Sequence, residues 1–319
     1  MMEKVRIVYV AGSGRSGSTV LGQVLGEVPN WAFCGELRQG FSILAANNLC
    51  GCGAPAQKCD FWRAVIQHAF GGFDRDMLER ASDLTQRVSL HRHSLVHLSP
   101  LKAPAFVRDT AEYADIVTRV YQGIRSVTGC KVIVDSSKIP SYYFILKQSA
   151  QLDTRVVHIV RDSRAVVYSN RRKKYDPSNT WGRQYLLQQG LALTAVAWNL
   201  KNAFISSAIA KSNESILLRY EDFVVAPDKA LRQIVDLVDP AQSPPPVRGA
   251  QLEIGTQHTL GGNPVKFRTG PVQLRLDDEW QSMMDQRQRI LVTGLTWPMI
   301  AAYGYLGRGR RTGAATVAT

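Results

Sequence analysis

The segment VRIVYV (Val5–Val10) runs directly into AGSGRSGST (Ala11–Thr19), and VLGQVLGEVPNWAFCGE (Val20–Glu36) follows. The first segment is apolar and rich in β-branched residues, which is typical of a buried parallel strand. After the glycine-rich segment, apolar residues recur at helical spacing. A strand, a glycine-rich turn and a helix start form an anion site, because glycines let the backbone approach a ligand and the unpaired N–H groups of the first helical turn point at it. The stretch therefore predicts a phosphate-binding loop.

Three kinds of phosphate loop fit this turn. The spacing of Gly12, Gly14 and Gly17 matches the G-x-G-x-x-G of dinucleotide-binding folds, and Glu36 lies 19 residues after Gly17, near where such folds place an acid. The stretch also nearly matches the P-loop pattern G-x-x-x-x-G-K-[ST], but Ser18 stands in place of the lysine. The third kind is a phosphosulfate-binding loop, in which an arginine and hydroxyls replace the lysine. The turn by itself does not choose among the three.

Composition and charge limit the kind of partner. The 319 residues are 45% hydrophobic and 20% charged, and we predict a single domain over residues 1–306 with a disordered tail over 307–319. The 39 Lys and Arg exceed the 26 Asp and Glu, a formal net charge of +13, which favours an anionic ligand. The sequence contains no basic run interleaved with aromatic residues and no zinc-finger spacing, so we do not expect nucleic acid as a partner.

The sequence favours a cytoplasmic protein. Little sequence precedes the first predicted strand, which leaves no room for a signal peptide or an N-terminal anchor. The most apolar long stretch, Leu186–Ala210, contains Gln188, Asn199 and Lys201, so it predicts a buried helix and not a membrane span. Five cysteines, an odd number, without an export signal favour a reducing compartment.

Three of the cysteines lie in one loop, Asn47–Asp60, NNLCGCGAPAQKCD. The C-x-C-x₆-C spacing of Cys50, Cys52 and Cys59 could supply three of the four ligands of a metal site, or a redox device. No fourth ligand lies at a usual spacing, and the glycines and proline of the segment already explain it as a turn. We therefore expect no metal, and the role of the loop stays open.

The rest of the chain alternates predicted strands with helices. The strands after the first are Trp31–Cys34, Lys131–Asp135, Arg155–Val160 and Ile216–Arg219. Such alternation, without internal repeats, predicts a mostly parallel, doubly wound sheet flanked by helices, which is a three-layer α/β fold. The glycine-rich, basic segment Gly255–Leu276 is predicted to be a loop.

Basic side chains follow the ends of the predicted strands. Arg15 lies in the glycine-rich turn, Lys138 follows the third strand and Arg161 follows the fourth. Open α/β sheets bind ligands at the carboxyl ends of their strands, so we expect these residues near one another. If a helix begins near Asp162, Arg161 and Ser169 could converge on a second phosphate.

Together these segments resemble one family, the sulfotransferases that use 3′-phosphoadenosine 5′-phosphosulfate (PAPS). The glycine-rich turn looks like the phosphosulfate-binding loop of that family, and Arg161 with Ser169 looks like its 3′-phosphate motif. Asp135–Lys138 resembles the bacterial and Golgi-type members, and Gly262–Arg268 resembles the late loop that closes on the nucleotide. The resemblance runs from about residue 5 to about residue 280 and implies a fold related to the P-loop kinases. It implies nucleotide contacts from Gly14, Arg15, Ser16, Gly17, Ser18, Thr19, Arg161, Ser169, Tyr220, Asn263, Lys266 and Arg268.

The resemblance also implies a mechanism. Cys34-Gly35-Glu36 looks like the tripeptide of tyrosylprotein sulfotransferases in which the glutamate is the base. Glu36 would then accept the proton of an acceptor hydroxyl, while Arg15 and Lys138 stabilise charge around the sulfuryl group, without a metal. The product would be 3′-phosphoadenosine 5′-phosphate (PAP), and the acceptor a small-molecule, lipid or glycan hydroxyl. The expected acceptor pocket is lined by three loops, Phe41–Trp62, His91–Val107 and Tyr175–Leu187.

The sequence does not identify the acceptor, the oligomeric state or any peripheral membrane or carrier-protein partner. It also leaves two other functions open. An NAD(P)-dependent Rossmann-type reductase would use G-x-G-x-x-G and Glu36, and Tyr143 with Lys147 forms the Y-x-x-x-K pair of short-chain dehydrogenases. That interpretation leaves the second phosphate motif and the late basic loop unexplained, and Cys130 replaces the usual partner serine. The other is a non-catalytic nucleotide-binding module, against which Glu36 and Lys138 argue.

Overall fold

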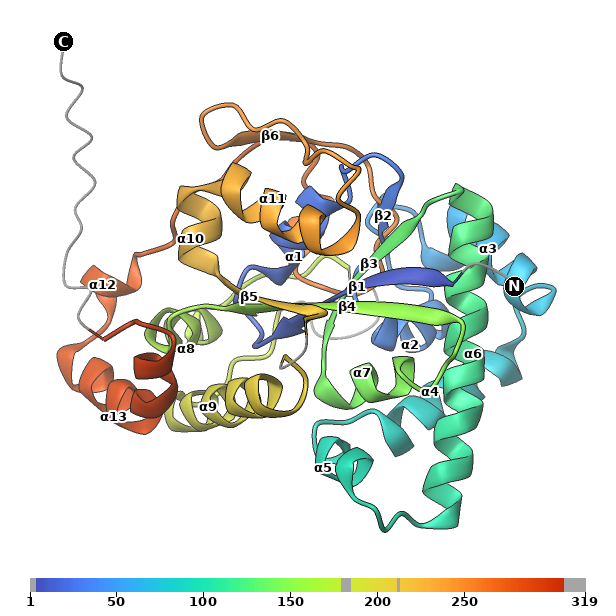
Figure 1. Cartoon of the computed structure of the whole chain (residues 1–319), viewed down its shortest axis with the longest axis horizontal. Helices are drawn as coiled ribbons and strands as arrows, with labels where there is room; N and C mark the ends of the chain where they lie inside the picture. Colours follow the sequence, from blue (N-terminus) through green and yellow to red (C-terminus); the bar gives the residue numbers. More distant parts are fainter. Residues whose placement is uncertain (1–3, 179–184, 211–212, 307–319) are drawn as a thin grey trace.

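The computed structural model describes residues 4–178, 185–210 and 213–306 (Figure 1). Its centre is a five-stranded sheet in the order β2-β3-β1-β4-β5, in which each neighbouring pair is parallel. The strands are β1 (Val5–Gly12), β2 (Trp31–Phe33), β3 (Val132–Lys138), β4 (Leu152–Val160) and β5 (Ser215–Arg219). The predicted mostly parallel sheet is confirmed, whereas the predicted tail over 307–319 lies outside the described residues.

The central strand β1 is buried on both faces, as its apolar sequence predicts. Ile7, Tyr9 and Ala11 belong to the core on one side of the sheet, and Val8 and Val10 belong to the core on the other side. Because side chains alternate between the two faces of a strand, one apolar run contributes to two cores.

Helices form a layer on each side of the sheet (Figure 1). One layer contains α2 (Gly40–Ala45), α3 (Asp60–Phe70), α4 (Arg75–Val88), α6 (Pro104–Thr128), α7 (Pro140–Leu146) and α9 (Leu191–Ala208), with α5 (His93–Leu98) packed against α7. The other contains α1 (Ser18–Leu25), α10 (Tyr220–Val225) and α11 (Pro227–Val238). Three more helices pack with α9 around separate apolar clusters: α8 (Ser163–Arg171), α12 (Trp280–Met283) and α13 (Gln286–Ala302). Short 3₁₀ helices are η1 (Leu37–Gln39), η2 (Ala56–Lys58) and η3 (Pro264–Phe267).

The segment Gly255–Leu276 is not the plain loop that the sequence predicts. It contains η3 and the strand β7 (Gly270–Gln273), which pairs antiparallel with β6 (Gln251–Ile254). A four-residue strand that begins with Gly-Pro has little local preference for strand structure, so its pairing with β6 decides its conformation.

Most of the apolar stretch Leu186–Ala210 belongs to the helix α9, which is buried along one side only. Trp198 is fully buried, whereas Leu193 and Leu200 are exposed. The prediction of a buried helix is therefore correct for only one face of α9. Among the described residues, no helix is both long enough and apolar enough to cross a bilayer.

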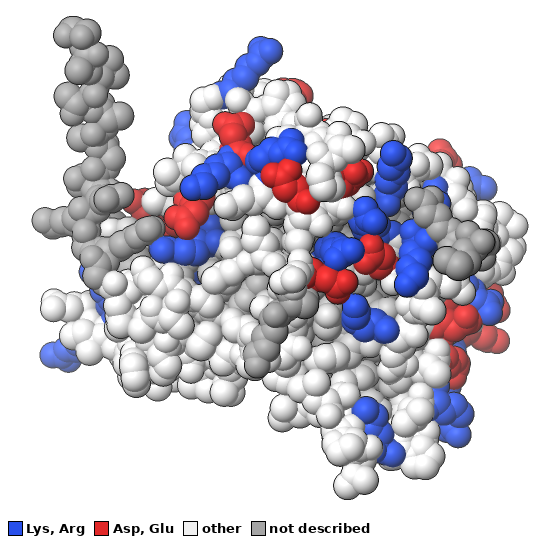
Figure 2. Space-filling model, in the orientation of Figure 1, with Lys and Arg blue, Asp and Glu red and all other residues white. Residues whose placement is uncertain are grey.

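Figure 2 shows that Lys and Arg side chains are interspersed with Asp and Glu on this face of the molecule. Across the described residues, several basic side chains are paired with acidic ones: Arg232 contacts Asp236, and Arg155 contacts both Asp153 (3.4 Å) and Glu214 (3.2 Å). The excess positive charge of the sequence thus forms no continuous basic surface on the described part of this face, which is the surface that nucleic-acid binding needs.

Candidate active site

The strand ends that precede polar and basic residues meet at one edge of the sheet. Strand β1 lies between β3 and β4 and runs parallel to both, so the residues that follow Gly12, Lys138 and Val160 are neighbours there. Gly12 has φ 149°, and a Cβ at this position would lie 2.3 Å from the carbonyl oxygen of Ile159. The glycine therefore keeps β1 close to β4 immediately before the chain turns toward α1.

The predicted phosphate loop lies between β1 and α1. Gly17 (φ 85°) precedes α1, and no side chain caps this helix, so the N–H groups of its first turn are open to a ligand. A Cβ at Gly17 would lie 2.5 Å from the ring of Tyr220, so the glycine lets that ring pack on the loop. Ser16 is buried, and its hydroxyl has no hydrogen-bond partner within the part of the chain that the structure describes. An oxygen of a bound phosphate would satisfy such a group.

A cavity of about 520 Å³ opens at this edge, a volume typical of small-molecule sites. Of the residues that the sequence predicts to bind nucleotide or to catalyse, those that line it are Gly14, Arg15, Gly17, Ser18, Thr19, Glu36, Lys138, Arg161, Ser169, Tyr220 and Asn263. Ser16, Lys266 and Arg268 do not line it. Lys266 is buried and its ammonium donates to the carbonyl of Leu49 (3.2 Å), while Arg268 is exposed.

Glu36 and Lys138 form an ion pair in this cavity, and only 11% and 12% of their side chains are exposed. The Lys138 ammonium also donates to the carbonyl of Ser136 (2.7 Å). Gln39 Nε2 donates to the second carboxylate oxygen of Glu36 (2.7 Å), so both oxygens have donors and the carboxylate is held in one orientation. Sequence analysis missed Gln39, whose only signal is its place three residues after Glu36 in the tight 3₁₀ turn η1.

A buried carboxylate supports the turn that presents Lys138. Asp135 accepts hydrogen bonds from the Tyr121 hydroxyl (2.5 Å) and from the N–H and hydroxyl of Ser137 (2.7 and 2.5 Å). Burial raises the pKa of Asp135 to about 6, although these donors oppose the shift. The Ser137 hydroxyl in turn accepts from the backbone N–H of Arg38 (3.0 Å), which joins the end of β3 to η1.

The segment Gly255–Leu276, called the late segment below, reaches the cavity. It does so by pairing with the residues around the predicted base, Glu36. Leu260 exchanges two backbone hydrogen bonds with Cys34–Glu36, at 2.7 and 2.9 Å. A Cβ at Gly35 (φ 85°) would lie 2.3 Å from the Leu260 carbonyl oxygen, so this close approach requires glycine. The backbone N–H of Asn263 donates to Thr19 Oγ1 (3.3 Å). The late segment therefore contacts both the predicted base and the phosphate loop.

Arg161 and Ser169 lie on the same cavity because α8 begins between them. The helix begins near Asp162, the condition on which the convergence of Arg161 and Ser169 depends: Asp162 caps α8, since its side chain accepts from the backbone N–H of Arg164 (2.9 Å). The residue that follows β4 and the residue two turns into α8 thereby face one ligand space.

The guanidinium of Arg161 has partners that hold it in place. Its Nη1 donates to the carbonyl of Arg15 (3.1 Å), and its Nη2 pairs with the carboxylate of Asp277 (3.0 Å). It also lies over the ring of Tyr220, 4.7 Å from the centroid. Asp277 is a cavity residue that sequence analysis missed, because nothing local indicates its contact with a residue more than a hundred positions earlier.

Lys174 is a second cavity residue that sequence analysis missed. It belongs to the basic run Arg171–Lys174, which resembles an ordinary solvated surface in the sequence. Burial lowers the pKa of Lys174, and the neighbouring charges of Arg15 and Arg172 lower it further. A polyanion bound in the cavity would relieve this repulsion among cations.

Two of the three loops expected around the acceptor contribute to the cavity. The first supplies Ile43 and Asn48, and the third supplies Asp176, Ser178 and Leu186. The loop expected between His91 and Val107 does not line the cavity. That loop leads from α5 into α6, in the layer below the sheet, and the cavity opens at the edge of the sheet.

The dehydrogenase-like pair lies outside the cavity. Tyr143 packs against the ring of Tyr9 in the core (6.0 Å between centroids), and Lys147 pairs with Glu214 (3.4 Å). Neither residue lines the cavity, so the structure does not support the reductase interpretation.

Lys201 on α9 is buried and interacts electrostatically with the Glu36–Lys138 ion pair, so its effect on stability can be tested. Burial lowers its pKa from 10.5 to about 8; the positive charge of Lys138 contributes, and the charge of Glu36 opposes the shift. The unfolded chain keeps this proton to higher pH, so the cost of burying the ammonium is present below pH 8 and is lost as the pH rises toward 10.5. We expect Lys201→Met to raise the free energy of unfolding at neutral pH by about 1–3 kcal/mol, with a smaller gain at alkaline pH.

The measurement is denaturant unfolding of the variant and the wild type at neutral and alkaline pH. Lys229→Met is the control, because Lys229 is exposed on α11 and its replacement should change stability little at either pH. A Lys201→Met variant no more stable than the wild type at neutral pH would contradict the prediction.

No curated protein matches the sequence. Similarity to solved structures extends over most of the chain. Among solved structures, the sulfotransferase domain of the olefin synthase from Synechococcus PCC 7002 is 16% identical, with a TM-score of 0.44 over 94% of this chain and 96% of that one. The sulfotransferase domain of the curacin biosynthetic pathway is 17% identical, with a TM-score of 0.43 over 92% and 98% of the two chains. Structural similarity this low supports no conclusion about this chain.

The family assignment rests on a match to a family model. Residues 8–242 match the model described as "Sulfotransferase family". The match begins within β1 and includes the phosphate loop, the Glu36–Lys138 pair, Arg161 with Ser169, and Tyr220. The three-layer architecture around a parallel sheet, with a glycine-rich turn between β1 and α1, is the P-loop-kinase-like fold of this family. The chain therefore belongs to the sulfotransferase family.

Proposed function

We propose that this protein transfers the sulfuryl group of PAPS to the hydroxyl of a small-molecule, lipid or glycan acceptor. The observation that carries the proposal is that two elements with the features of anion-binding sites line one cavity. The phosphate loop before α1 supplies the first, and Arg161 with Ser169 supplies the second. PAPS carries anionic groups at both its 5′ and 3′ positions, so it requires two such elements, whereas ADP requires only the first.

The residues of the phosphate loop fit the 5′ end of this donor. The N–H groups at the start of α1 and the hydroxyls of Ser18 and Thr19, which line the cavity, would donate to its oxygens. Arg15 and Lys174 would add positive charge, and Tyr220 would pack against the loop. Arg161 and Ser169 would bind the 3′-phosphate, and the guanidinium would then exchange Asp277 for the phosphate.

Glu36 is the proposed base. In the transfer, the acceptor oxygen forms a bond to sulfur, the bond from sulfur to the bridging 5′-phosphate oxygen breaks, and the acceptor proton passes to Glu36. The hydrogen bond from Gln39 orients the carboxylate toward the cavity. Lys138 would leave its ion pair with Glu36 and stabilise the negative charge that develops on the departing oxygen, together with Arg15.

A non-catalytic binding module would not need a carboxylate and an ammonium paired next to a phosphate loop. A carboxylate repels phosphates, and its ion pair with Lys138 offsets the positive charge that would otherwise attract them, so Glu36 would weaken nucleotide binding. The arrangement of Glu36 and Lys138 in the cavity therefore favours an enzyme.

Nucleotide preference tests the proposal. PAP should stabilise the protein more than ADP at the same concentration, because PAP also engages Arg161 and Ser169. At a hundredfold excess over Kd we expect a gain of about 2.7 kcal/mol, which corresponds to a rise in Tm of about 4 °C for a chain of this length. The measurement is thermal unfolding with PAP, ADP, NADH or ATP.

The control for this experiment is Ser169→Ala, which should reduce the shift with PAP but not the shift with ADP. Equal shifts with PAP and ADP in the wild type would contradict the second phosphate element. A larger shift with NADH than with PAP would favour the reductase interpretation.

A further inference from the structure

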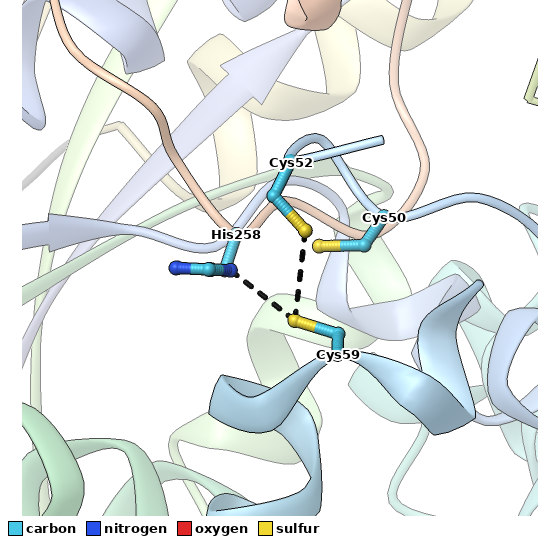
Figure 3. Close-up of side chains that lie close together, drawn as sticks. All are labelled: Cys50, Cys52, Cys59 and His258. Carbon is cyan, nitrogen blue, oxygen red and sulfur yellow. Dashed lines mark hydrogen bonds between the residues drawn. The ribbon is translucent and has the colours of Figure 1, made fainter. Parts of the chain in front are cut away.

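Four potential metal ligands from two distant parts of the chain meet beside the active-site cavity (Figure 3). Cys50, Cys52 and Cys59 lie around the turn before α3, and His258 comes from the segment between β6 and η3. Their ligand atoms all lie within 4.8 Å of one another. The expectation of no metal rested on the lack of a fourth ligand near the cysteines in the sequence, and the fold supplies that ligand from 199 residues later.

We propose that Cys50, Cys52, Cys59 and His258 bind one zinc ion, which serves as a structural clamp next to the active site. Three thiolates and one imidazole form a four-ligand set typical of structural zinc, with no open position for a substrate or a reactive water. The inference concerns a metal site and does not depend on the donor or acceptor proposed above.

The separations suit tetrahedral zinc. Bond lengths of about 2.3 Å to sulfur and about 2.0–2.1 Å to nitrogen place two sulfur ligands about 3.8 Å apart and a sulfur–nitrogen pair about 3.6 Å apart. The Sγ atoms of Cys52 and Cys59 are 3.7 Å apart, and Cys59 Sγ lies 3.2 Å from Nδ1 of His258. The other pairs of ligand atoms are at most 4.8 Å apart, so these distances must shorten by at most about 1 Å for all four atoms to bind one ion.

Backbone hydrogen bonds within the protein form the turn that carries Cys50 and Cys52. The N–H of Cys50 donates to the carbonyl of Ala54, and the N–H of Gly53 donates back to the carbonyl of Cys50 (both 2.9 Å). Gly53 has φ 88°, and a Cβ at Gly51 would lie 2.3 Å from Thr259 Oγ1. The two glycines therefore let a tight turn place Cys50 and Cys52 directly against the segment that carries His258.

The imidazole is held by contacts outside the ligand set. The ring of Phe61 stacks on His258, with 4.9 Å between centroids and 11° between planes, and Trp62 Nε1 donates to the backbone carbonyl of His258 (3.1 Å). Such outer contacts orient a metal-binding histidine. A disulfide between Cys52 and Cys59 would explain only two of the four residues and would leave this oriented imidazole without a role.

The clamp would act on the segment that closes the cavity. Thr259, next to His258, accepts from the backbone N–H of Gly51 (2.9 Å), and Leu260 pairs with Cys34–Glu36. Gly261, Gly262 and Asn263 then line the cavity. A zinc ion that ties the cysteine turn to His258 would hold this segment beside the predicted base, which explains why the four ligands are spread over two parts of the chain.

The first test is the metal content of the full chain, produced without a histidine tag and purified without chelator. We expect about one zinc per chain by elemental analysis, and Co²⁺ substitution should produce the intense visible absorption of a tetrahedral cobalt–thiolate centre. A protein that contains no zinc and yields no such absorption with Co²⁺ overturns the proposal. So does a disulfide between Cys52 and Cys59 found by mass spectrometry of the native protein.

Variants test the ligands. Cys52→Ser and His258→Ala should each lower the bound zinc at least about tenfold after exposure to a mild chelator, because each removes one of four ligands. Cys130→Ser is the matched control, since Cys130 is a buried cysteine outside the cluster, and it should keep the zinc. Full zinc retention in both ligand variants overturns the proposal. PAP binding by the wild type is measured separately, so failure of the zinc site and failure of the proposed function are distinguishable.

Discussion

Replacement of Glu36 by glutamine should lower sulfuryl transfer by about 10²–10⁴-fold, because the amide keeps the size of the side chain but cannot accept the acceptor's proton. The substitution should remove the base while leaving the neighbouring contacts in place. Gln39 would still contact the new side chain, and Lys138 would keep its hydrogen bond to the carbonyl of Ser136. PAP affinity should change little, since Glu36 faces the acceptor and not the phosphates in the proposed arrangement. The measurements are transfer from labelled PAPS and titration with PAP.

The control for Glu36→Gln is Glu79→Gln. Glu79 is an exposed carboxylate on α4 that pairs with Arg75 (2.7 Å), so both transfer and binding should be unchanged in that variant. A Glu36→Gln enzyme with wild-type turnover would place the base elsewhere. A wild type that binds PAP tightly yet transfers to no hydroxyl acceptor would favour the non-catalytic module instead.

Arg161→Ala should weaken PAP binding by about 1.5–3 kcal/mol, which corresponds to roughly 10- to 150-fold in Kd, through loss of a charge-assisted hydrogen bond. Arg161 also contacts the backbone of Arg15, so the substitution can loosen the phosphate loop as well. Titration with both PAP and ADP separates the two effects, because only PAP has a 3′-phosphate. The expected result is a large loss for PAP and a small loss for ADP.

Asp277→Asn tests the same phosphate contact without removing Arg161. The Asp277 carboxylate pairs with Arg161 at 3.0 Å and would compete with a 3′-phosphate for the guanidinium. Its neutralisation should leave PAP binding unchanged or make it tighter. Equal losses for PAP and ADP in Arg161→Ala, or weaker PAP binding in Asp277→Asn, would contradict the assignment of Arg161 to the 3′-phosphate.

Elements with local causes could be predicted from the amino-acid sequence. The apolar run of β1 predicts a strand buried on both faces, and the glycines that follow predict the turn before α1, because these preferences act between near neighbours. A helix start near Asp162 was predictable for the same reason, and it places Arg161 and Ser169 on one cavity. Parallel strands also share one carboxyl edge, which brings Lys138 toward the phosphate loop.

Contacts between residues far apart in the sequence became known from the folded structure. Asp277 reaches Arg161, Leu260 pairs beside Glu36, and His258 joins the cysteine turn across 199 residues, yet no local pattern marks any of these contacts. The conformation of β7 likewise depends on β6, a strand outside its own segment. Local preferences specify strands, turns and caps, but contacts between separated segments depend on how the sheet and its layers pack, and the fourth metal ligand became visible only through that packing.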